Sequence, residues 1–187
     1  MISKPYLLFL GDAKDELAIK TAAGINYWRP EWCIGQMSLP NAKSSLGINE
    51  ISLEEAVKRG AKTFVLGVVN AGGKMPEGWI DIIVKAISLG LNIASGMHSR
   101  LSSFDEISKA AIKHGVKLHD LRYNNIEFDT GKGLKRTGKR LLTVGTDCSV
   151  GKKYTALAVE KAMLEKNMKV SFKATGQTGV LIAENGI

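Results

Sequence analysis

Short apolar runs alternate with helix-forming segments through the first 120 residues, and this alternation constrains the fold more than any other feature. Residues 63–69 (TFVLGVV) are apolar without polar alternate positions, which is typical of a strand covered on both faces. Strands that are joined by short connections through intervening helices pair in parallel, through right-handed crossovers. We therefore predict an α/β fold: a Rossmann-like, doubly wound parallel sheet with helices on both faces.

The other elements of this part follow from apolar runs, capping residues and glycines. We expect strands at 6–10, 33–39, 91–94 and 116–118. We expect helices at 14–23, 52–60, 79–89 and 103–114. The segments that start at Ser52 (SLEE) and Ser103 (SFDE) have the pattern of a capping box, in which the serine hydroxyl accepts from the backbone three residues later.

A second strand–loop–helix pattern begins after a polar segment that is rich in glycine and lysine. We expect a strand at 141–144, a helix at 152–166, a strand at 168–172 and a turn at 174–179. The chain then divides into a Rossmann-like domain at 1–123, a linker at 124–140 and the first part of a P-loop α/β domain at 141–187. One helix between two strands cannot cover both faces of a parallel sheet, so we expect this second domain to be truncated.

Residues 144–155 (VGTDCSVGKKYT) have the features of a phosphate-binding loop. A strand that runs through glycine into a helix directs backbone N–H groups and the positive end of the helix dipole at one point. Glycines permit the sharp turn, and a lysine at the helix start adds a full positive charge. The predicted cofactor-binding residues are Gly145, Thr146, Asp147, Cys148, Ser149, Val150, Gly151, Lys152, Lys153 and Thr155.

Two positions differ from the usual loop, G-x-x-x-x-G-K-[ST]. Thr146 stands where the first glycine is expected, and Lys153 replaces the hydroxyl that binds Mg²⁺ in nucleotide hydrolases. An ammonium group only donates hydrogen bonds, so Lys153 cannot be that metal ligand. We therefore expect the loop to bind a phosphorylated ligand rather than to split a triphosphate, and we predict no metal site.

Several segments, taken together, resemble the D-glutamate N-acetyltransferase family. They are NYWRPEWCIGQ at 26–36, VVNAGGKMP at 68–76, ASGMHSRLS at 94–102, LHDLR at 118–122, VGTDCSVGKKYTALAVEKAM at 144–163 and FKATGQTGVLIAENGI at 172–187. The resemblance covers essentially the whole chain, and it implies a Rossmann-like domain followed by a P-loop domain. It also implies transfer of an acetyl group from acetyl-CoA to the amine of D-glutamate, in D-amino acid catabolism. The family continues past the last segment, so we expect an N-terminal fragment that is inactive alone.

A shorter segment, GTDCSVGK, is also similar to the loop of dethiobiotin synthetase. This similarity implies an alternative function, an ATP-dependent ligase or kinase that uses ATP and Mg²⁺. A non-catalytic module that binds a nucleotide or CoA is a third interpretation of the same loop.

The chemistry implied by the family needs a general base and partners for two substrate carboxylates. His98 and His119 lie in predicted loops and are candidate bases. Arg122 follows a predicted strand and is a candidate partner for a carboxylate.

Further candidates lie at the two ends of the chain. Three residues follow a predicted strand beside the phosphate loop and are candidate substrate ligands: Thr175, Gln177 and Thr178. Three residues of the first domain are candidates to close over a bound ligand: Trp28, Arg29 and Trp32.

Composition narrows the expected partners and compartment. The formal net charge is +8, partly from GKGLKRTGKR at 131–140, but that segment has no interleaved aromatic residue and no nucleic-acid motif accompanies it. No run of about 18 apolar residues indicates a membrane span, and two cysteines make neither a disulfide framework nor a zinc site. We expect a cytoplasmic protein with a small-molecule substrate and no nucleic-acid or membrane partner, assembled as a homo-oligomer.

Overall fold

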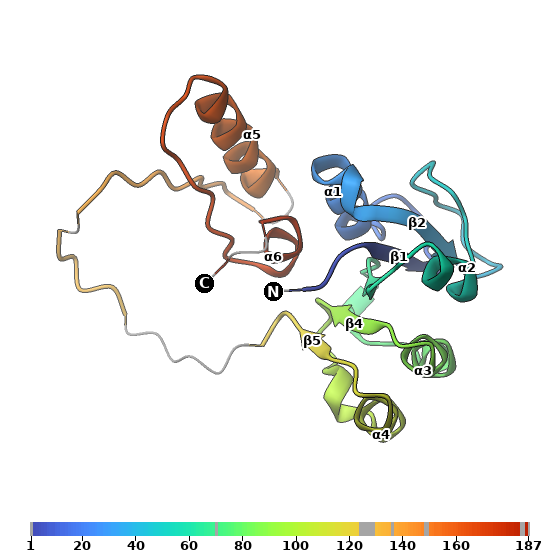
Figure 1. Ribbon diagram of the computed structural model, residues 1–187. Helices are drawn as coiled ribbons and strands as arrows, with labels where there is room; N and C mark the ends of the chain where they lie inside the picture. Colours follow the sequence, from blue (N-terminus) through green and yellow to red (C-terminus); the bar gives the residue numbers. More distant parts are fainter. Residues whose placement is uncertain are drawn as a thin grey trace.

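The computed structural model describes residues 2–69, 71–123, 130–135, 137–147, 150–183 and 186 (Figure 1). Within them, five parallel strands form one sheet in the order β2-β1-β3-β4-β5. The strands are β1 (Tyr6–Gly11), β2 (Cys33–Ser38), β3 (Thr63–Leu66), β4 (Asn92–Ser95) and β5 (Leu118–Asp120). The predicted Rossmann-like sheet is confirmed.

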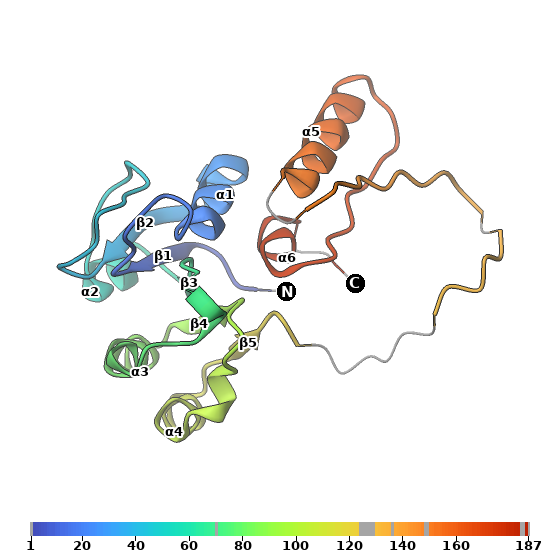
Figure 2. The ribbon, with the colours of Figure 1, turned by 180° about the vertical axis from the view of Figure 1, so that it is seen from behind.

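Helices connect these strands and cover both faces of the sheet. They are α1 (Lys20–Trp28), α2 (Leu53–Lys58), α3 (Ile80–Ser88) and α4 (Asp105–His114), with short 3₁₀ turns η1 (Pro30–Trp32), η2 (Ala71–Gly73), η3 (Glu77–Trp79) and η4 (Leu101–Ser103). Right-handed crossovers place α1 on one face and the other three helices on the opposite face. Figure 2 shows α1 across the sheet from α3 and α4.

The centre of the core lies on β1, whose residues are all buried. The ring of Phe9 packs against Phe64 of β3 and, edge to face, against Trp79, at centroid distances of 5.0 and 5.2 Å. Burying one such side chain contributes roughly 1.5–3 kcal/mol. The absence of a polar alternate position in β1 and β3 therefore reflects helices on both faces.

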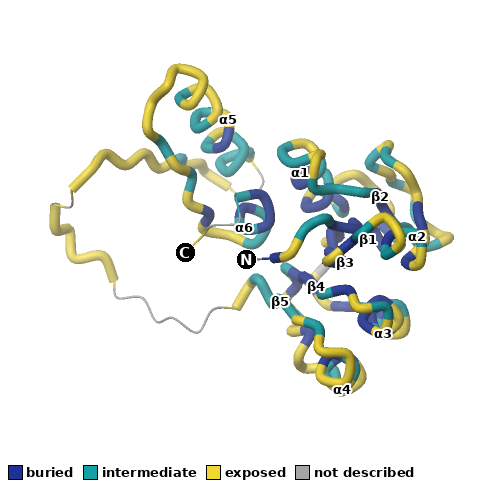
Figure 3. Tube along the Cα trace, viewed as in Figure 1, coloured by how far each residue is buried: buried dark blue, intermediate teal, exposed yellow. Residues whose placement is uncertain are grey.

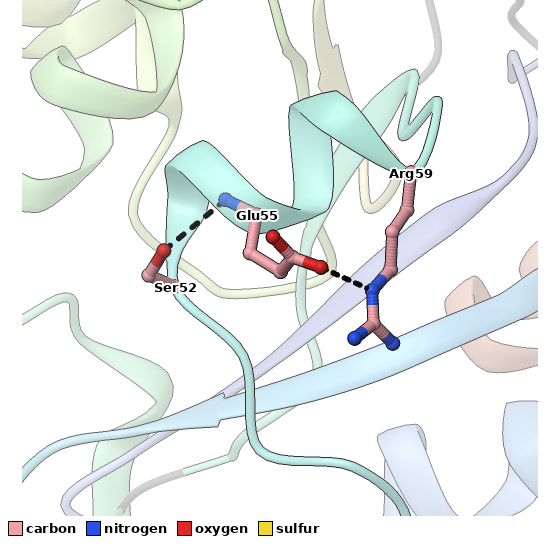
Figure 4. Close-up of polar contacts among 3 residues, drawn as sticks. All are labelled: Ser52, Glu55 and Arg59. Atoms are coloured by element: carbon pink, nitrogen blue, oxygen red, sulfur yellow. Dashed lines mark hydrogen bonds and ion pairs between the residues drawn. The ribbon is translucent and has the colours of Figure 1, made fainter.

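The first predicted capping box is confirmed and the second is wrong. Ser52 Oγ accepts a hydrogen bond from Glu55 N at 3.1 Å, and Glu55 Oε1 accepts from Arg59 Nε at 2.7 Å (Figure 4). Ser103 instead belongs to η4, and its hydroxyl donates to the carbonyl of Arg100. The 3₁₀ turn delays the start of α4, so its N-cap is Phe104, without a side-chain cap.

Two other elements are displaced from their predicted positions. Residues 16–19 form turns, with Asp15 Oδ1 accepting from Ala18 N at 2.8 Å, so α1 begins at Lys20 rather than at residue 14. β5 begins at Leu118, two residues later than predicted.

The second part of the chain contributes α5 (Lys152–Glu165) and α6 (Gln177–Ala183). The strands predicted at 141–144 and 168–172 are wrong, because the structure places no strand there, and the turn predicted at 174–179 runs into α6. A parallel strand forms only beside a neighbour that accepts its hydrogen bonds. Leu141, Leu142 and Val144 are each more than 70% exposed, in a segment that lies apart from the sheet and leads to α5 (Figure 3).

α6 nevertheless joins the core of the first domain. It lies beside α1, and its Leu181 and Ile182 are buried in the same apolar cluster as the sheet residues (Figures 1 and 3). In α5, Leu157 is buried, whereas Ala158 and Ala162 are exposed. The second part of the chain is thus attached to the sheet through α1. Among the described residues, no helix combines the length and apolar character needed to cross a bilayer.

Candidate functional site

Two glycines close the predicted phosphate loop. Gly151 has φ 98° and forms the N-cap of α5, a left-handed conformation that favours glycine. A Cβ on Gly145 would lie 2.9 Å from Val150 Cγ2 and 3.2 Å from Lys152 Cγ, so the loop packs tightly against residue 145. Gly145, Thr146, Asp147 and Val150 are exposed, so this part of the loop is open to a ligand. Cys148 and Ser149 lie outside the described residues.

The ammonium group of Lys152 lies across this loop. It donates a hydrogen bond to the carbonyl oxygen of Asp147, while Thr143 Oγ1 donates to the carbonyl of Lys152 at 2.9 Å. The acceptor of the ammonium group is a neutral carbonyl, so the positive charge is not neutralised there. Lys152 therefore brings one cation to the start of a 14-residue helix, where the helix dipole also favours an anion.

Lys153 and Thr155, the next two predicted cofactor-binding residues, have different surroundings. Burial, and to a lesser extent the charge of Lys20, lowers the pKa of Lys153 to about 8. Its Cδ lies 3.7 Å from where a Cβ on Gly179 of α6 would be, so its stem faces α6. Thr155 Oγ1 donates to the carbonyl of Gly151 at 3.1 Å, which uses its proton inside the helix.

Tyr154 joins the phosphate-loop helix to α1. Its ring stacks on Trp28 at a centroid distance of 6.5 Å and an interplanar angle of 21°, and its hydroxyl donates to the carbonyl of Lys20 at 3.3 Å. A Cβ on Gly24 would lie 3.1 Å from Tyr154 Cζ, so a glycine in the middle of α1 permits this approach. The phosphate loop is thereby held beside the first domain.

Arg29 and Thr21 attach α6 to the same helix. Arg29 Nε donates to the carbonyl of Ile182 at 3.1 Å, and the hydroxyls of Thr21 and Thr178 lie 3.2 Å apart. Trp32 receives the guanidinium of Arg29 over its ring at 5.2 Å. The predicted trio of Trp28, Arg29 and Trp32 therefore supports the junction between the two parts of the chain.

The structure brings the candidates Arg122 and Gln177 together. With its amide oxygen turned toward Arg122, Gln177 accepts from Nε, NH1 and NH2 at 3.2, 3.2 and 3.0 Å. Arg122 Nε also faces the carbonyl of Gly96 at 3.3 Å, and a Cβ on Gly96 would lie 2.9 Å from Gln177 Cβ. Arg122 thus connects the end of β5 to α6. Thr175 is exposed before this helix.

His98 lies in the loop after β4, at the carboxyl edge of the sheet. Its N–H donates to the carbonyl of Gly73 at 2.8 Å, and its carbonyl accepts from the hydroxyl of Tyr123. The imidazole is exposed. His98 therefore belongs to the same group of loops as Arg122, and its ring is accessible.

His119 lies within β5 rather than in a loop, so its predicted location is wrong. Burial lowers its pKa, with the charge of Lys117 contributing. Its Nε2 is buried and has no hydrogen-bond partner among the described residues. Burial therefore favours the neutral form of this histidine.

A hollow that no sequence pattern predicted lies at the carboxyl ends of β1 and β3. It measures about 440 Å³, and its lining includes Asp12, Lys14 and Lys20 from the segment after β1, Val69 from the segment after β3, and Trp79. Strand order creates it, and strand order is not visible in a local pattern. The available signal was the charged sequence GDAKDE directly after the first strand.

Two sequence families match successive parts of the chain. Residues 38–124 match a family described as "Domain of unknown function (DUF1611_N) Rossmann-like domain". Residues 127–187 match a family described as "Domain of unknown function (DUF1611_C) P-loop domain".

Two similar proteins carry the name D-glutamate N-acetyltransferase. One, from a Pseudoalteromonas species, is 53% identical over 186 residues, and the other, from Tritonibacter scottomollicae, is 49% identical over 187 residues. Each match covers 100% of this chain and 56% of the relative, so the chain spans about half the length of the curated relatives it matches.

A crystal structure of a DUF1611 family protein from Anabaena variabilis, at 2.30 Å resolution, has a similar fold. The TM-score is 0.84 at 25% sequence identity, and the match covers 99% of this chain and 57% of that chain.

Proposed function

The chain belongs to the DUF1611 family, with a Rossmann-like domain followed by P-loop sequence. From this membership we propose that it is part of an N-acetyltransferase. The reaction moves an acetyl group from acetyl-CoA to the amine of D-glutamate. Support comes from the two relatives of that name, which are 49–53% identical along this whole chain. A cytoplasmic location and assembly as a homo-oligomer belong to the same proposal.

The observation that carries the proposal is the glycine-closed loop at the start of α5, with Lys152 across it. The phosphates of CoA need oriented N–H donors and a cation, and a helix start with a lysine supplies both. The junction of Tyr154 with Trp28 keeps this loop beside the sheet. A cofactor bound by its phosphates at the loop can therefore extend toward the carboxyl edge of the strands, where α/β sheets bind their ligands.

The proposed reaction sets requirements that residues at this edge can meet. The substrate ammonium loses one proton to a base, and its nitrogen then attacks the thioester carbonyl carbon. The carbon–sulfur bond breaks, and the second proton lost from the nitrogen ends on the sulfur, which leaves as the CoA thiol. We assign the removal of the proton to His98, whose accessible imidazole lies at the carboxyl edge. Arg122 lies in the neighbouring loop and is exposed, so it adds positive charge for an anionic substrate.

An ATP-dependent ligase or kinase is less well supported by the side chains of the loop. The position that usually supplies a hydroxyl to Mg²⁺ is Lys153, whose stem faces α6. The next hydroxyl, Thr155 Oγ1, donates to the carbonyl of Gly151. Acetyl-CoA is therefore the preferred ligand in this proposal, with ATP and Mg²⁺ as the alternative.

The direct test is release of free CoA thiol from acetyl-CoA in the presence of D-glutamate. It should be measured on this chain and on a chimera that adds the remaining length of the Pseudoalteromonas relative, with that relative as the positive control. We expect thiol release by the chimera, N-acetyl-D-glutamate by mass spectrometry, and a loss of rate in the His98→Gln variant. A folded chimera that binds acetyl-CoA but releases no thiol would favour a non-catalytic CoA-binding module.

A further inference from the structure

The hollow between β1 and β3 is placed where this type of sheet binds ligands. The strand order sets β1 beside β3, and the connections leave these two strands toward opposite faces, through α1 and α3. Such a switch point opens a crevice outside the carboxyl ends of the strands. The volume of about 440 Å³ is within the range of small-molecule sites, roughly 300–1,000 Å³.

The floor of the hollow is apolar and consists of tightly packed residues. Trp79 is 3% exposed and packs edge to face on Phe9. Gly11 has φ +56°, and a Cβ there would lie only 3.0 Å from Trp79 Cε2, so both the backbone and the indole require glycine. Backbone bonds close the wall: Val69 N donates to the carbonyl of Ala18 at 2.7 Å.

The rim of the hollow carries charges of both signs. Two cations, Lys14 and Lys20, and two carboxylates, Asp12 and Asp15, line it. Lys14 Nζ lies 3.8 Å from Asp12 Oδ2, and both side chains are about half exposed, at 58% and 49%. Lys14 Nζ also donates a hydrogen bond to the carbonyl of Asn41 at 3.2 Å. An exposed ion pair of this kind contributes little to stability, so Lys14 can exchange these acceptors for a charged ligand.

The hollow also adjoins the phosphate-loop helix. Lys20 lines the hollow, and its carbonyl accepts from the hydroxyl of Tyr154 on α5. Lys153 is close enough to Lys20 for the two charges to interact. A ligand in the hollow would therefore lie beside the first residue of α1, which also contacts the first turn of α5.

We propose that this hollow binds the acceptor substrate, an amino acid with a second carboxylate. Its carboxylates are held by Lys14 and Lys20, its ammonium group by Asp12, and its methylene groups lie on Trp79. The mixed rim favours a molecule that carries both signs of charge over a simple dianion. The proposal rests on the proposed function, because it names the seat of the amine that the acetyl group reaches.

The role of Arg122 changes under this proposal. Its guanidinium already has Gln177 and the carbonyl of Gly96 as acceptors, which makes it a connection between β5 and α6. A substitution at Arg122 therefore distinguishes two possible substrate sites: the hollow, and the end of β5 where Arg122 lies.

Calorimetric titration with D-glutamate tests the proposal on the wild-type chain and on Lys14→Met, Lys20→Met, Arg122→Met and Lys113→Met. Lys113 is an exposed lysine in the last turn of α4, and it does not line the hollow. We expect Lys14→Met and Lys20→Met to weaken D-glutamate binding about tenfold or more, since each loses a charge-assisted contact. Lys113→Met should bind as the wild type does, and D-alanine, without the second carboxylate, should bind more weakly than D-glutamate.

Two results overturn the proposal. One is wild-type affinity for D-glutamate in both lysine variants, or a loss only in Arg122→Met, which would move the seat to β5. The other is a folded wild-type chain that does not bind D-glutamate at millimolar concentration.

Acetyl-CoA titrations and thiol release on the same variants distinguish this failure from failure of the proposed function. D-Glutamate binding that depends on Lys14 and Lys20, without thiol release by the chimera, would keep the amino-acid site and refute the acetyl transfer. Thiol release with an unchanged KM for D-glutamate in the Lys14 and Lys20 variants would support the acetyl transfer and refute the amino-acid site in the hollow.

Discussion

At the scale of single residues, the loop before α5 differs from the usual phosphate loop in what surrounds its two lysines. Lys153 occupies the position of a metal-binding hydroxyl, yet its stem faces α6 and its pKa is lowered to about 8 by burial. Lys152, one residue earlier, lies across the loop instead. Two adjacent lysines therefore have different surroundings: Lys152 lies across the loop, and Lys153 lies at the junction between α5, α6 and α1.

The lowered pKa of Lys153 predicts a pH-dependent stability difference. The ordinary lysine value is 10.5 and the folded value is about 8, so between these values the unfolded chain holds a proton that the folded chain has released. Stability from this group therefore rises with pH through that window and is lowest below about pH 8. We expect Lys153→Met to raise Tm relative to the wild type at pH 7, and this difference to shrink as the pH approaches 10.5.

Lys161→Met is the matched control, because Lys161 is an exposed lysine of the same helix. Its Tm difference from the wild type should not close over the same pH window. If the two variants behave alike across the window, Lys153 is not a buried cation.

At the scale of elements, local patterns predicted those segments whose determinants are local. The strand at 63–69 could be predicted because both faces of β3 are covered. The Ser52 cap could be predicted because the serine hydroxyl and Glu55 N are close in sequence. Ser103 has the same sequence pattern as Ser52, but it belongs to the 3₁₀ turn η4. Leu101 N donates to Asp120 Oδ1 of β5, and this hydrogen bond fixes that turn. This contact comes from a distant strand and cannot be derived from four residues.

The two serines make a paired prediction on helix capping. Ser52→Ala should lower the free energy of unfolding by about 1 kcal/mol, because Glu55 N loses its acceptor at the start of α2. Ser103→Ala should have a smaller effect, since its hydroxyl caps no helix. Urea unfolding of both variants measures the difference, and equal losses would mean that the two serines have the same role.

The candidate site was predictable only in part, for the same physical reason. Gly145, Gly151 and Lys152 are adjacent in sequence, and their loop is found where expected. The pairing of Arg122 with Gln177 joins residues 55 positions apart in sequence, and the hollow depends on the order of strands. α6 was missed because Gly176 and Gly179 are typical of a turn, whereas burial of Leu181 and Ile182 against α1 stabilises a helix.

At the scale of the whole molecule, the described residues form one parallel sheet with its helices, and the second segment is attached to it through α1. α6 lies against α1 within the same apolar core, while α5 buries Leu157 and is attached to α1 by Tyr154 (Figures 1 and 3). The domain division at 123 and 140 remains a prediction. The contacts make α6 a part of the first domain's core, although it follows the phosphate loop in sequence.

This attachment predicts how the molecule unfolds. Ile182→Ala removes a fully buried side chain of α6 and should lower the stability of the main unfolding transition by about 2–5 kcal/mol. Leu164→Ala on α5 is the control, because Leu164 is 52% exposed and its loss should stay within about 0.5 kcal/mol. Thermal unfolding followed by tryptophan fluorescence reports on the sheet domain, and an unchanged main transition in Ile182→Ala would show that α6 is independent of it.

The most direct test of the central claim, that the loop before α5 holds the phosphates of acetyl-CoA, is a calorimetric comparison of two ligands. The chain is titrated with acetyl-CoA and with ATP–Mg²⁺, as wild type, as Lys152→Ala and as the exposed-site control Lys161→Ala. We predict tighter binding of acetyl-CoA than of ATP–Mg²⁺, a loss of at least about tenfold in Lys152→Ala, and no loss in Lys161→Ala. A preference for ATP–Mg²⁺ that depends on Lys152, or acetyl-CoA binding that is unchanged in Lys152→Ala, would contradict the claim.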